Sequence, residues 1–202
     1  MKSIITFLTV SLITLSSFGQ DQMFDICPLK VGEEIPENIK ITSVDGKSVD
    51  MREVLSEKSV LVFYRGGWCP YCIRHLAALN EALPTIDSLG YQLLAITPDQ
   101  FDSLGVSTER SSSEYELYSD SEINAIEAFG LGWKIEDERY KSYIKKYDLD
   151  MEEWSGQKHH ILPVPAVYII KDGKVEFNYI NPNYSIRLKP STLIAVLESL
   201  SE

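Results

Sequence analysis

Short apolar runs separated by turn-forming residues recur along the chain. Residues 39–44 alternate apolar and polar side chains and end at Asp45-Gly46, a pair that favours a hairpin turn into a second strand at residues 48–50. Residues 60–64 and 92–96 are continuous apolar runs, which are typical of strands buried on both faces of a sheet. The pattern therefore predicts a hairpin followed by two interior strands.

Between these two apolar runs, the hydrophobic period changes to that of a helix. The helix is expected to begin at Pro70, because the N–H that proline lacks has no partner in a first turn anyway, and Pro84 is expected to kink it. Its apolar residues are spaced by three and four positions, at Ile73, Leu76, Leu79 and Leu83. A strand, a helix and a second strand in this order predict a right-handed parallel crossover.

The apolar runs are shorter, and the sequence is more polar, in residues 107–130. Residues 107–113 predict a loop, and residues 115–118 predict a short strand. Asp120 or Ser121 can cap a helix that ends at Gly130. That helix would carry one apolar face, formed by Ile123, Ile126 and Phe129.

The last third of the chain begins with a highly charged segment. Residues 133–158 predict an inserted surface helix plus loop whose charges face water. Residues 164–170 and 175–180 flank an Asp-Gly turn and predict an antiparallel hairpin, with Pro165 tolerated at the first strand position. A final helix is expected from Ser191 to Leu200. The predicted class is α/β, with a mixed central sheet flanked by helices and an inserted charged helix before the late hairpin.

Candidate chemistry lies at the junction of the first buried strand and the long helix, in the sequence Trp68-Cys69-Pro70-Tyr71-Cys72. Cys69 is expected at the helix N-cap, where unpaired N–H groups and the positive end of the helix dipole lower a thiol pKa. Cys72, one turn further on, can close a disulfide with Cys69. The pair then forms a reversible two-electron couple that needs no bound cofactor.

Two other interpretations of this motif are open. A structural zinc site needs two more ligands, and the candidates are His159 and His160, with Cys27 far upstream. Adjacent histidines rarely both face one metal, and no second Cys-x-x-Cys exists. A purely structural Cys69–Cys72 disulfide would close too small a loop to constrain the unfolded chain.

The N-terminus has the pattern of a secretory signal peptide. It carries one positive charge at Lys2, an apolar run from Ile4 to Leu15, and the small residues Ser17 and Gly19 before a polar stretch. Cleavage after Gly19 would leave one domain at residues 20–202 and export the protein, which favours the bacterial periplasm. The alternatives are an uncleaved membrane anchor and a buried helix.

The net charge and the length of the chain exclude some classes of function. The chain has 30 acidic and 19 basic residues, a net charge of −11, and loses Lys2 with the signal. An acidic protein of this kind is not expected to bind nucleic acid or an anionic membrane surface. A domain of about 180 residues builds a full core without disulfides. Its cysteines are therefore not scaffolding.

Several short motifs spread over nearly the whole mature chain point to one family. The sequence resembles the thioredoxin fold and, within it, the peroxiredoxin-like branch of the alkyl hydroperoxide reductase and thiol-specific antioxidant group. The motifs are Lys30-Val31-Gly32 with Ile35-Pro36, the Asp45-Gly46 turn, Phe63-Tyr64-Arg65-Gly66-Gly67-Trp68-Cys69-Pro70-Tyr71-Cys72, Ala95-Ile96-Thr97-Pro98-Asp99, Tyr118-Ser119-Asp120 and Ala128-Phe129-Gly130.

The resemblance implies a thiol-dependent antioxidant enzyme. Such an enzyme reduces hydrogen peroxide or organic hydroperoxides and is recharged by a thiol reductant such as a thioredoxin-like protein. Peroxiredoxins typically carry Pro-x-x-x-Thr-x-x-Cys, and on this chain these landmarks fall on Arg65, Cys69 and Cys72. The family's activating arginine falls on Pro165, where thioredoxins carry a cis-proline. The alternatives are a thioredoxin-like reductase of exported protein disulfides and a non-catalytic binding module.

The two enzymatic interpretations assign the thiols opposite roles. As a disulfide reductase the protein would attack with Cys69, which is expected nearer the solvent, and resolve with Cys72. As a peroxiredoxin it would oxidise Cys72 to a sulfenic acid, which then condenses with Cys69. Both end in a Cys69–Cys72 disulfide. Pro165 is expected to follow a cis peptide bond and to lie against this turn.

Nearby polar residues are candidates for supporting roles. Arg65 either stabilises a thiolate or a peroxide oxygen, or it faces water. His75 lies one turn beyond Cys72 and either lowers a thiol pKa or is an exposed helix residue. The thioredoxin fold would bring His159 and His160 toward the thiols, and one of them is a candidate for proton transfer.

The remaining candidates concern contacts with other molecules. Trp68 and Tyr71 are expected at the rim of the site, where they would contact a partner, although Trp68 can simply pack. Cys27 is an odd thiol that can resolve an intermediate, pair between subunits or remain a free tail cysteine. The sequence predicts no particular oligomeric state.

Overall fold

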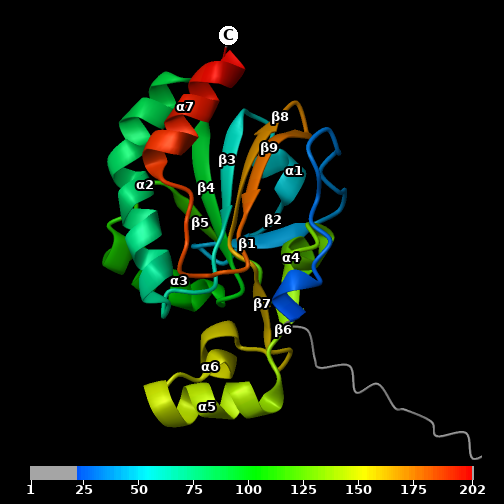
Figure 1. Ribbon diagram of the computed structural model, residues 1–202, viewed down its shortest axis with the longest axis vertical. Coiled ribbons are helices and arrows are strands. Elements are labelled where there is room, and N and C mark those ends of the chain that lie inside the picture. The colour runs from blue at the N-terminus through cyan, green and yellow to red at the C-terminus, as the bar shows by residue number, and fades with distance from the viewer. Residues whose placement is uncertain (1–21, 202) are drawn as a thin grey trace, which may run out of the picture.

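The computed structural model describes residues 22–201, so the predicted signal segment 1–19 lies outside the described residues. A seven-stranded mixed sheet with the order β2-β1-β5-β4-β3-β8-β9 forms the centre, and β6 and β7 pair separately (Figure 1). The strands are β1 (Lys40–Ser43), β2 (Ser48–Asp50), β3 (Ser59–Phe63), β4 (Gln92–Thr97), β5 (Glu116–Ser119), β6 (Gly132–Lys134), β7 (Ile161–Pro163), β8 (Ala166–Lys171) and β9 (Lys174–Ile180).

Helices cover both faces of the sheet. Figure 1 shows α2 and α7 side by side on one face and α1 and α4 on the other. The helices are the short 3-10 helix η1 (Gln22–Phe24), α1 (Met51–Val54), α2 (Pro70–Ser88), α3 (Phe101–Ser111), α4 (Asn124–Ala128), α5 (Asp137–Tyr147), α6 (Met151–Ser155) and α7 (Pro190–Ser201). The predicted mixed sheet flanked by helices is confirmed.

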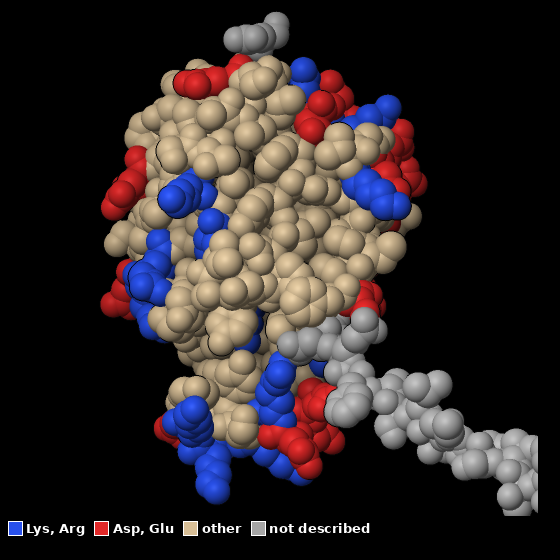
Figure 2. Space-filling model, in the orientation of Figure 1, with Lys and Arg blue, Asp and Glu red and all other residues tan. Residues whose placement is uncertain are grey.

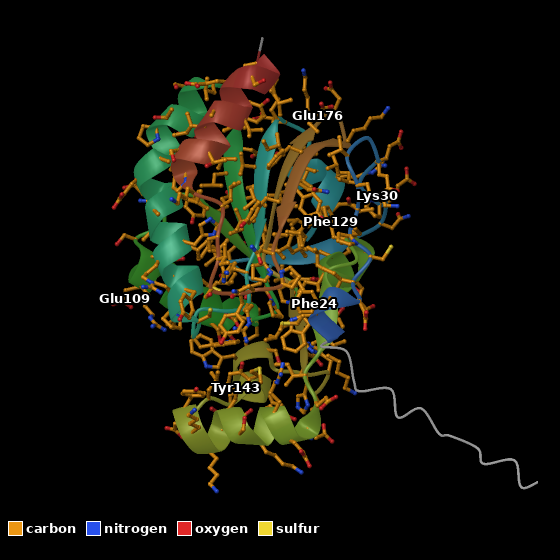
Figure 3. All side chains as sticks on the ribbon, in the orientation of Figure 1. Phe24, Lys30, Glu109, Phe129, Tyr143 and Glu176 are labelled. Carbon is orange, nitrogen blue, oxygen red and sulfur yellow. The ribbon has the colours of Figure 1, made fainter. Side chains whose placement is uncertain are left out.

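Strand β3 shows how alternation builds two cores. Val60 and Val62 face the cluster beneath α2 and α7, whereas Leu61 and Phe63 face the cluster beneath α1 and α4. On the second face, the ring of Phe129 packs 5.0 Å from that of Phe63 between centroids (Figure 3). Full burial of each such side chain contributes about 1.5–3 kcal/mol to folding. The continuous apolar run at residues 60–64 therefore marks a strand covered on both sides.

The predicted parallel crossover is confirmed. Strand β3 pairs in parallel with β4 and antiparallel with β8. Helix α2 joins β3 to β4 and continues through Pro84 to Ser88. The Cys-x-x-Cys turn therefore lies at the carboxyl end of the central strand, where open α/β sheets generally bind ligands.

The loop predicted at residues 107–113 is wrong over most of its length, because α3 extends to Ser111. The helix buries Leu104, Ser107 and Ser111 against the body. Two of its hydroxyls bond carbonyls within the helix: Thr108 Oγ1 bonds the Leu104 carbonyl at 3.2 Å, and Ser111 Oγ bonds the Ser107 carbonyl at 2.6 Å. Hydroxyls satisfied in this way allow a polar sequence to remain helical.

Helix α4 begins later than predicted, because its N-cap residue is Ile123 rather than Asp120 or Ser121. Asp120 nevertheless bonds the first turn of α4 through its side chain. Its carboxylate accepts hydrogen bonds from the backbone N–H groups of Ala125 at 3.1 Å and Ile126 at 2.8 Å. Gly130 follows the helix at φ +63, a left-handed conformation that favours glycine.

The charged insertion is more elaborate than one helix and a loop. It contains α5 and α6 and is joined to the body by the β6–β7 pair. Figure 1 shows α5 and α6 projecting below the body, near the start of α2. A third apolar cluster holds them there, formed by Met23, Trp133, Ile135, Tyr140, Met151, Leu162 and Val164.

The cis peptide bond expected before Pro165 is wrong. Every peptide bond within residues 22–201 is trans. The chain passes from β7 to β8 in an extended course, with the Val164 N–H bonded to the Leu131 carbonyl at 2.9 Å and the Pro165 carbonyl accepting from the Asn181 N–H at 3.2 Å. These hydrogen bonds hold residues 164 and 165 in the course that joins β7 to β8.

Candidate functional site

Cys69 is the N-cap of α2, with Pro70 at the first helical position, as predicted. The preceding turn brings it there through Gly66, whose φ of +147 favours glycine. A Cβ on Gly66 would overlap the Trp68 ring and lie 2.8 Å from Asp99 Oδ1. The turn therefore needs glycine both for its conformation and for its close packing.

Both thiols are reduced in the structure and both are buried. Cys69 is 1% exposed and Cys72 is 0% exposed, so neither thiol is open to solvent, although Cys69 is the less deeply buried of the two, as expected. A hydrogen bond from the Cys72 thiol, assisted by the charge of Arg65, lowers the pKa of Cys69 to about 6. Burial and the same hydrogen bond raise the pKa of Cys72. Near neutral pH the pair thus holds a thiolate on Cys69 and a neutral thiol on Cys72.

The predicted depression of the Cys69 pKa has a different main cause from the one expected. The helix N-terminus was the sequence-based reason, whereas the hydrogen bond from Cys72 is the largest influence in the structure. Burial opposes it by disfavouring the charged form. The neighbouring thiol is therefore part of the activation of Cys69 as well as its disulfide partner.

Arg65 is buried rather than exposed to water. Its guanidinium carbon lies 5.0 Å from the ring centroid of Trp68 and 4.4 Å from that of Tyr184. Its Nη2 donates to the hydroxyl of Tyr143 at 3.3 Å, and its Nε makes no hydrogen bond to the described residues. A cation held in this way acts on Cys69 with little solvent screening.

Arg187 is a second arginine that reaches the thiols, and sequence reasoning did not identify it. Arg187 lies between β9 and α7, and its Nη2 is 3.4 Å from Cys72 Sγ. Its Nη1 donates to the carbonyls of Tyr184 and Ile186, while Nε has no partner among the described residues. Its charge lowers the pKa of both thiols. Nothing local in the sequence links residue 187 to residue 72.

Asp99 is a second residue that the sequence did not mark as part of the site. It follows β4, is 1% exposed, and accepts a hydrogen bond from the Gly67 N–H at 2.7 Å. Burial raises the pKa of its carboxyl to about 7. Arg110 holds the next peptide group of the turn, since its Nη1 donates to the Gly67 carbonyl at 2.6 Å. Together they fix the turn that carries Cys69.

Neither of the two predictions for His75 is correct. It is buried, not exposed, and its Nε2 donates to the Leu188 carbonyl at 3.1 Å. Burial and then the charge of Arg187 lower the pKa of its imidazole to about 4. A neutral ring at physiological pH cannot act as an imidazolium that lowers a thiol pKa. His75 instead ties α2 to the segment before α7.

The two adjacent histidines lie near the insertion. His159 Nε2 donates to the Ser121 carbonyl at 3.0 Å, and its Nδ1 accepts from the Ile161 N–H at 2.9 Å. His160 Nε2 bonds Glu152 Oε1 at 2.8 Å, and its ring stacks on Tyr140. They line a small cavity together with Arg65, Trp68 and Asp99, but their bonds run to other groups. These contacts give no support to proton transfer by either ring.

The predicted rim residues differ in exposure. Tyr71 is 37% exposed, with its ring against Tyr184 at 5.8 Å and under the guanidinium of Arg74. Trp68 is half-buried and packs on the body and on the insertion. Pro165 lines a small cavity with His75 and Arg187, and Arg187 in turn reaches Cys72. Tyr71 therefore remains the rim candidate, and Trp68 is largely a packing residue.

Cys27 is exposed and lies apart from the thiol pair. Its backbone carbonyl packs against Gly130, just after α4. That helix covers the opposite face of the sheet from α2 (Figure 1).

Two further findings concern other classes of site. Within residues 22–201, no three or more histidine, cysteine, aspartate or glutamate residues are grouped so that they could hold a metal ion. None of the helices in that range has the length and apolar character needed to cross a bilayer.

The fold and the site define a thioredoxin-fold protein with a Cys-x-x-Cys pair at the start of a helix. The model of the AhpC/TSA family matches residues 31–178, which is most of the chain. The chain belongs to the AhpC/TSA family.

Curated relatives are peroxiredoxins. The putative peroxiredoxin bcp of Haemophilus influenzae is 27% identical over 104 residues, covering 52% of this chain and 66% of that protein. Peroxiredoxin Bcp of Escherichia coli strain K12 is 24% identical over 104 residues, with the same coverage. The match thus spans just under two thirds of the length of these relatives.

Solved structures agree on the fold. Peroxidoxin BcpB from Mycobacterium tuberculosis superimposes with a TM-score of 0.66 at 15% identity, covering 85% of this chain and 98% of that one. Peroxiredoxin Q of Xanthomonas campestris gives 0.64 at 16% identity, covering 85% and 99%. Reduced Prx3 from Vibrio vulnificus, solved in complex with hydrogen peroxide, gives 0.68 at 15% identity, covering 84% and 96%.

Proposed function

We propose that this protein is a thiol peroxidase that reduces hydrogen peroxide or organic hydroperoxides through the Cys69–Cys72 pair. The observation that carries the proposal is the asymmetry of the two thiols. Cys69 has a pKa lowered to about 6, while Cys72 keeps its proton and donates it in a hydrogen bond to Cys69. A thiolate beside a neutral thiol is the arrangement needed for attack followed by disulfide closure.

The first step is attack of the Cys69 thiolate on the peroxide. The sulfur forms a bond to the terminal oxygen, the O–O bond breaks, and the leaving alkoxide or hydroxide takes a proton from solvent. Cys69 becomes a sulfenic acid. Arg65 is buried and Arg187 partly buried, and each has a buried Nε–H with no partner among the described residues, which suits stabilisation of the charge that develops on oxygen.

The second step closes the disulfide. The Cys72 sulfur attacks the Cys69 sulfenic acid, its proton and the hydroxyl leave together as water, and the S–S bond forms. An external dithiol, such as a thioredoxin-like protein, then reduces the disulfide and is itself oxidised. The sum is one peroxide and one dithiol converted into an alcohol or water, a second water and one disulfide.

This assignment reverses the roles that the family's motif alone would give. The motif places the attacking cysteine at Cys72, whereas the lowered pKa lies at Cys69. The same asymmetry favours a second candidate function, a thioredoxin-like disulfide reductase, because that reaction also attacks with Cys69. The membership of the AhpC/TSA family and the peroxiredoxin relatives support the peroxidase as the leading proposal.

Rapid mixing of reduced protein with peroxide, followed by tryptophan fluorescence, tests the proposal. Because the Cys69 thiolate is present above its pKa and protonated below it, the rate should be full at pH 7. It should fall by roughly tenfold per pH unit below about pH 6. An insulin-reduction assay run alongside distinguishes the alternative. A peroxide rate no faster than that of a free small thiol, with insulin reduced, would establish the disulfide reductase instead.

We also propose that the protein works outside the cytoplasm, in the bacterial periplasm, after removal of residues 1–19. The charged, apolar and small-residue pattern of the N-terminus supports this location. N-terminal sequencing of the protein from a periplasmic fraction should begin at Gln20. Full-length protein retained in the membrane fraction would instead support the uncleaved anchor.

A further inference from the structure

Three aromatic residues from separate parts of the chain surround the Arg65 guanidinium. Trp68 belongs to the thiol turn, Tyr184 to the segment after β9, and Tyr143 to α5 of the insertion. We call these three residues the aromatic clamp. The Arg65 guanidinium lies over the ring faces of Trp68 and Tyr184. The hydroxyl oxygen of Tyr143 instead accepts a hydrogen bond from Arg65 Nη2 at 3.3 Å.

Tyr143 is held in place by the insertion. It lies on α5 beside the body in Figure 3, and its ring is 6.5 Å from that of Trp68. The insertion is fixed to the body by the Gln100 N–H, which donates to the Trp154 carbonyl at 2.8 Å, and by the Gln100 side chain, which donates to the Glu153 carbonyl at 3.0 Å. Tyr143 therefore contacts Arg65 from a segment that is hydrogen-bonded to the body.

We propose that α5 of the insertion is part of the thiol site, with Tyr143 as a positioning residue that fixes the Arg65 guanidinium beside Cys69. The inference rests on the proposed function only in taking Cys69 as the attacking thiol. A buried guanidinium needs acceptors for its N–H groups, and aromatic faces supply none of the directional kind. Without the Tyr143 oxygen, the cation is free to turn toward other acceptors, and its effect on Cys69 weakens with distance.

Several groups face Cys69 besides Arg65, so Tyr143 controls only part of its ionisation. Cys72 on α2 donates to the thiolate, Arg187 from the segment before α7 adds positive charge, and the carboxyl of Asp99 after β4 opposes the thiolate. Of the two arginines, Arg65 has the larger influence on Cys69. Removing its positioning contact should therefore shift the Cys69 pKa without abolishing the depression.

The test is a site-resolved titration of Cys69 in the reduced protein. The rate of Cys69 alkylation by iodoacetamide is measured between pH 5 and pH 9, with tandem mass spectrometry separating Cys69 from Cys72. We expect Tyr143→Phe to raise the Cys69 pKa by about half a unit to one unit, because the Arg65 charge that stabilises the thiolate is then held less firmly beside it. At pH 6, where about half of Cys69 is thiolate in the unmodified protein, that shift slows alkylation roughly two- to fivefold.

Two matched variants control for general effects. Tyr147→Phe removes a hydroxyl from the same helix at an exposed site and should leave the Cys69 pKa unchanged. Tyr140→Phe removes the hydroxyl that bonds Asp150 at 2.7 Å within the insertion, and thus deletes a hydrogen bond of α5 that does not involve Arg65. We expect it to leave the Cys69 pKa unchanged as well. A shift in Tyr140→Phe equal to that in Tyr143→Phe would overturn the inference.

A double-mutant cycle with Arg65→Gln completes the test. If Tyr143 acts through Arg65, Arg65→Gln raises the Cys69 pKa and the added Tyr143→Phe change has no further effect. The same shift on both backgrounds, or no shift in Tyr143→Phe alone, would overturn the inference. Because the titration uses no peroxide, it separates this inference from the proposed function. An ordinary pKa for Cys69 in the unmodified protein would overturn both.

Discussion

Cys69→Ser is expected to abolish rapid reaction with peroxide, whereas Cys72→Ser should retain one turnover that leaves a sulfenic acid on Cys69. The reason is that Cys69 holds the lowered pKa and Cys72 the raised one. Loss of the thiolate should slow the reaction by on the order of a thousandfold. Stoichiometric peroxide with dimedone trapping, followed by mass spectrometry of residues 66–74, measures both outcomes.

Cys27→Ser is the control for this pair, because Cys27 is exposed and packs near Gly130 on the far side of the sheet. It should leave both steps unchanged. A sulfenic acid trapped on Cys72 in Cys69→Ser would restore the order of attack that the family's motif gives. A Cys27–Cys72 crosslink with full turnover in Cys69→Ser would assign Cys27 the resolving role.

The central sheet was predictable because its strands are signalled locally. The interior run at residues 60–64, the Asp45-Gly46 turn and the late Asp-Gly turn each specify one element without reference to the rest of the chain. The helix after Cys69 was equally plain, since Pro70 and a regular apolar face fix its start and its buried side. For these elements, local propensity and the final fold agree.

The errors arose where tertiary contacts override a polar sequence. Helix α3 contains Ser107, Thr108 and Ser111, which favour a loop in isolation. In the folded chain Thr108 and Ser111 bond carbonyls one turn back, and Ser107 is buried against the body. One of the two predictions for His75 places it on the exposed face of the helix, yet it is buried and bonds Leu188. The position of α7 and the segment before it, which create that environment, is not readable from residues near His75.

The thiols of the candidate site were found from sequence, but most of what tunes them was not. Cys69 and Cys72 carry a motif with a fixed spacing, so they can be recognised alone. Arg187 and Tyr143 carry no motif, and Asp99 belongs to a family motif that did not mark it as part of the site. These residues reach the site from three distant segments. Their one shared sequence signal is a side chain that can form hydrogen bonds, and that signal is too common to select them.

Arg187→Met is expected to prolong the life of the Cys69 sulfenic acid by roughly tenfold, which corresponds to about one pKa unit on the resolving thiol. Arg187 donates to Cys72 Sγ at 3.4 Å, and its charge lowers the pKa of that thiol. Without it, Cys72 gives up its proton less readily when it attacks. Stopped-flow tryptophan fluorescence with one equivalent of peroxide resolves disulfide closure from the preceding attack.

The rate of disulfide closure should depend on a positive charge at residue 187 that points at Cys72. An arginine elsewhere near α2 should not affect it. Arg187→Lys keeps the charge but loses the planar fork, so it should recover part of the closure rate. Arg74→Met removes an exposed arginine that stacks on Tyr71 and should leave closure unchanged. The imidazole of His75 gives an independent signature, because Arg187 also lowers its pKa. Its NMR titration should move upward in Arg187→Met and stay fixed in Arg74→Met. Closure at the unmodified rate in Arg187→Met, with the His75 shift present, would show that the arginine charge reaches the site but does not drive resolution.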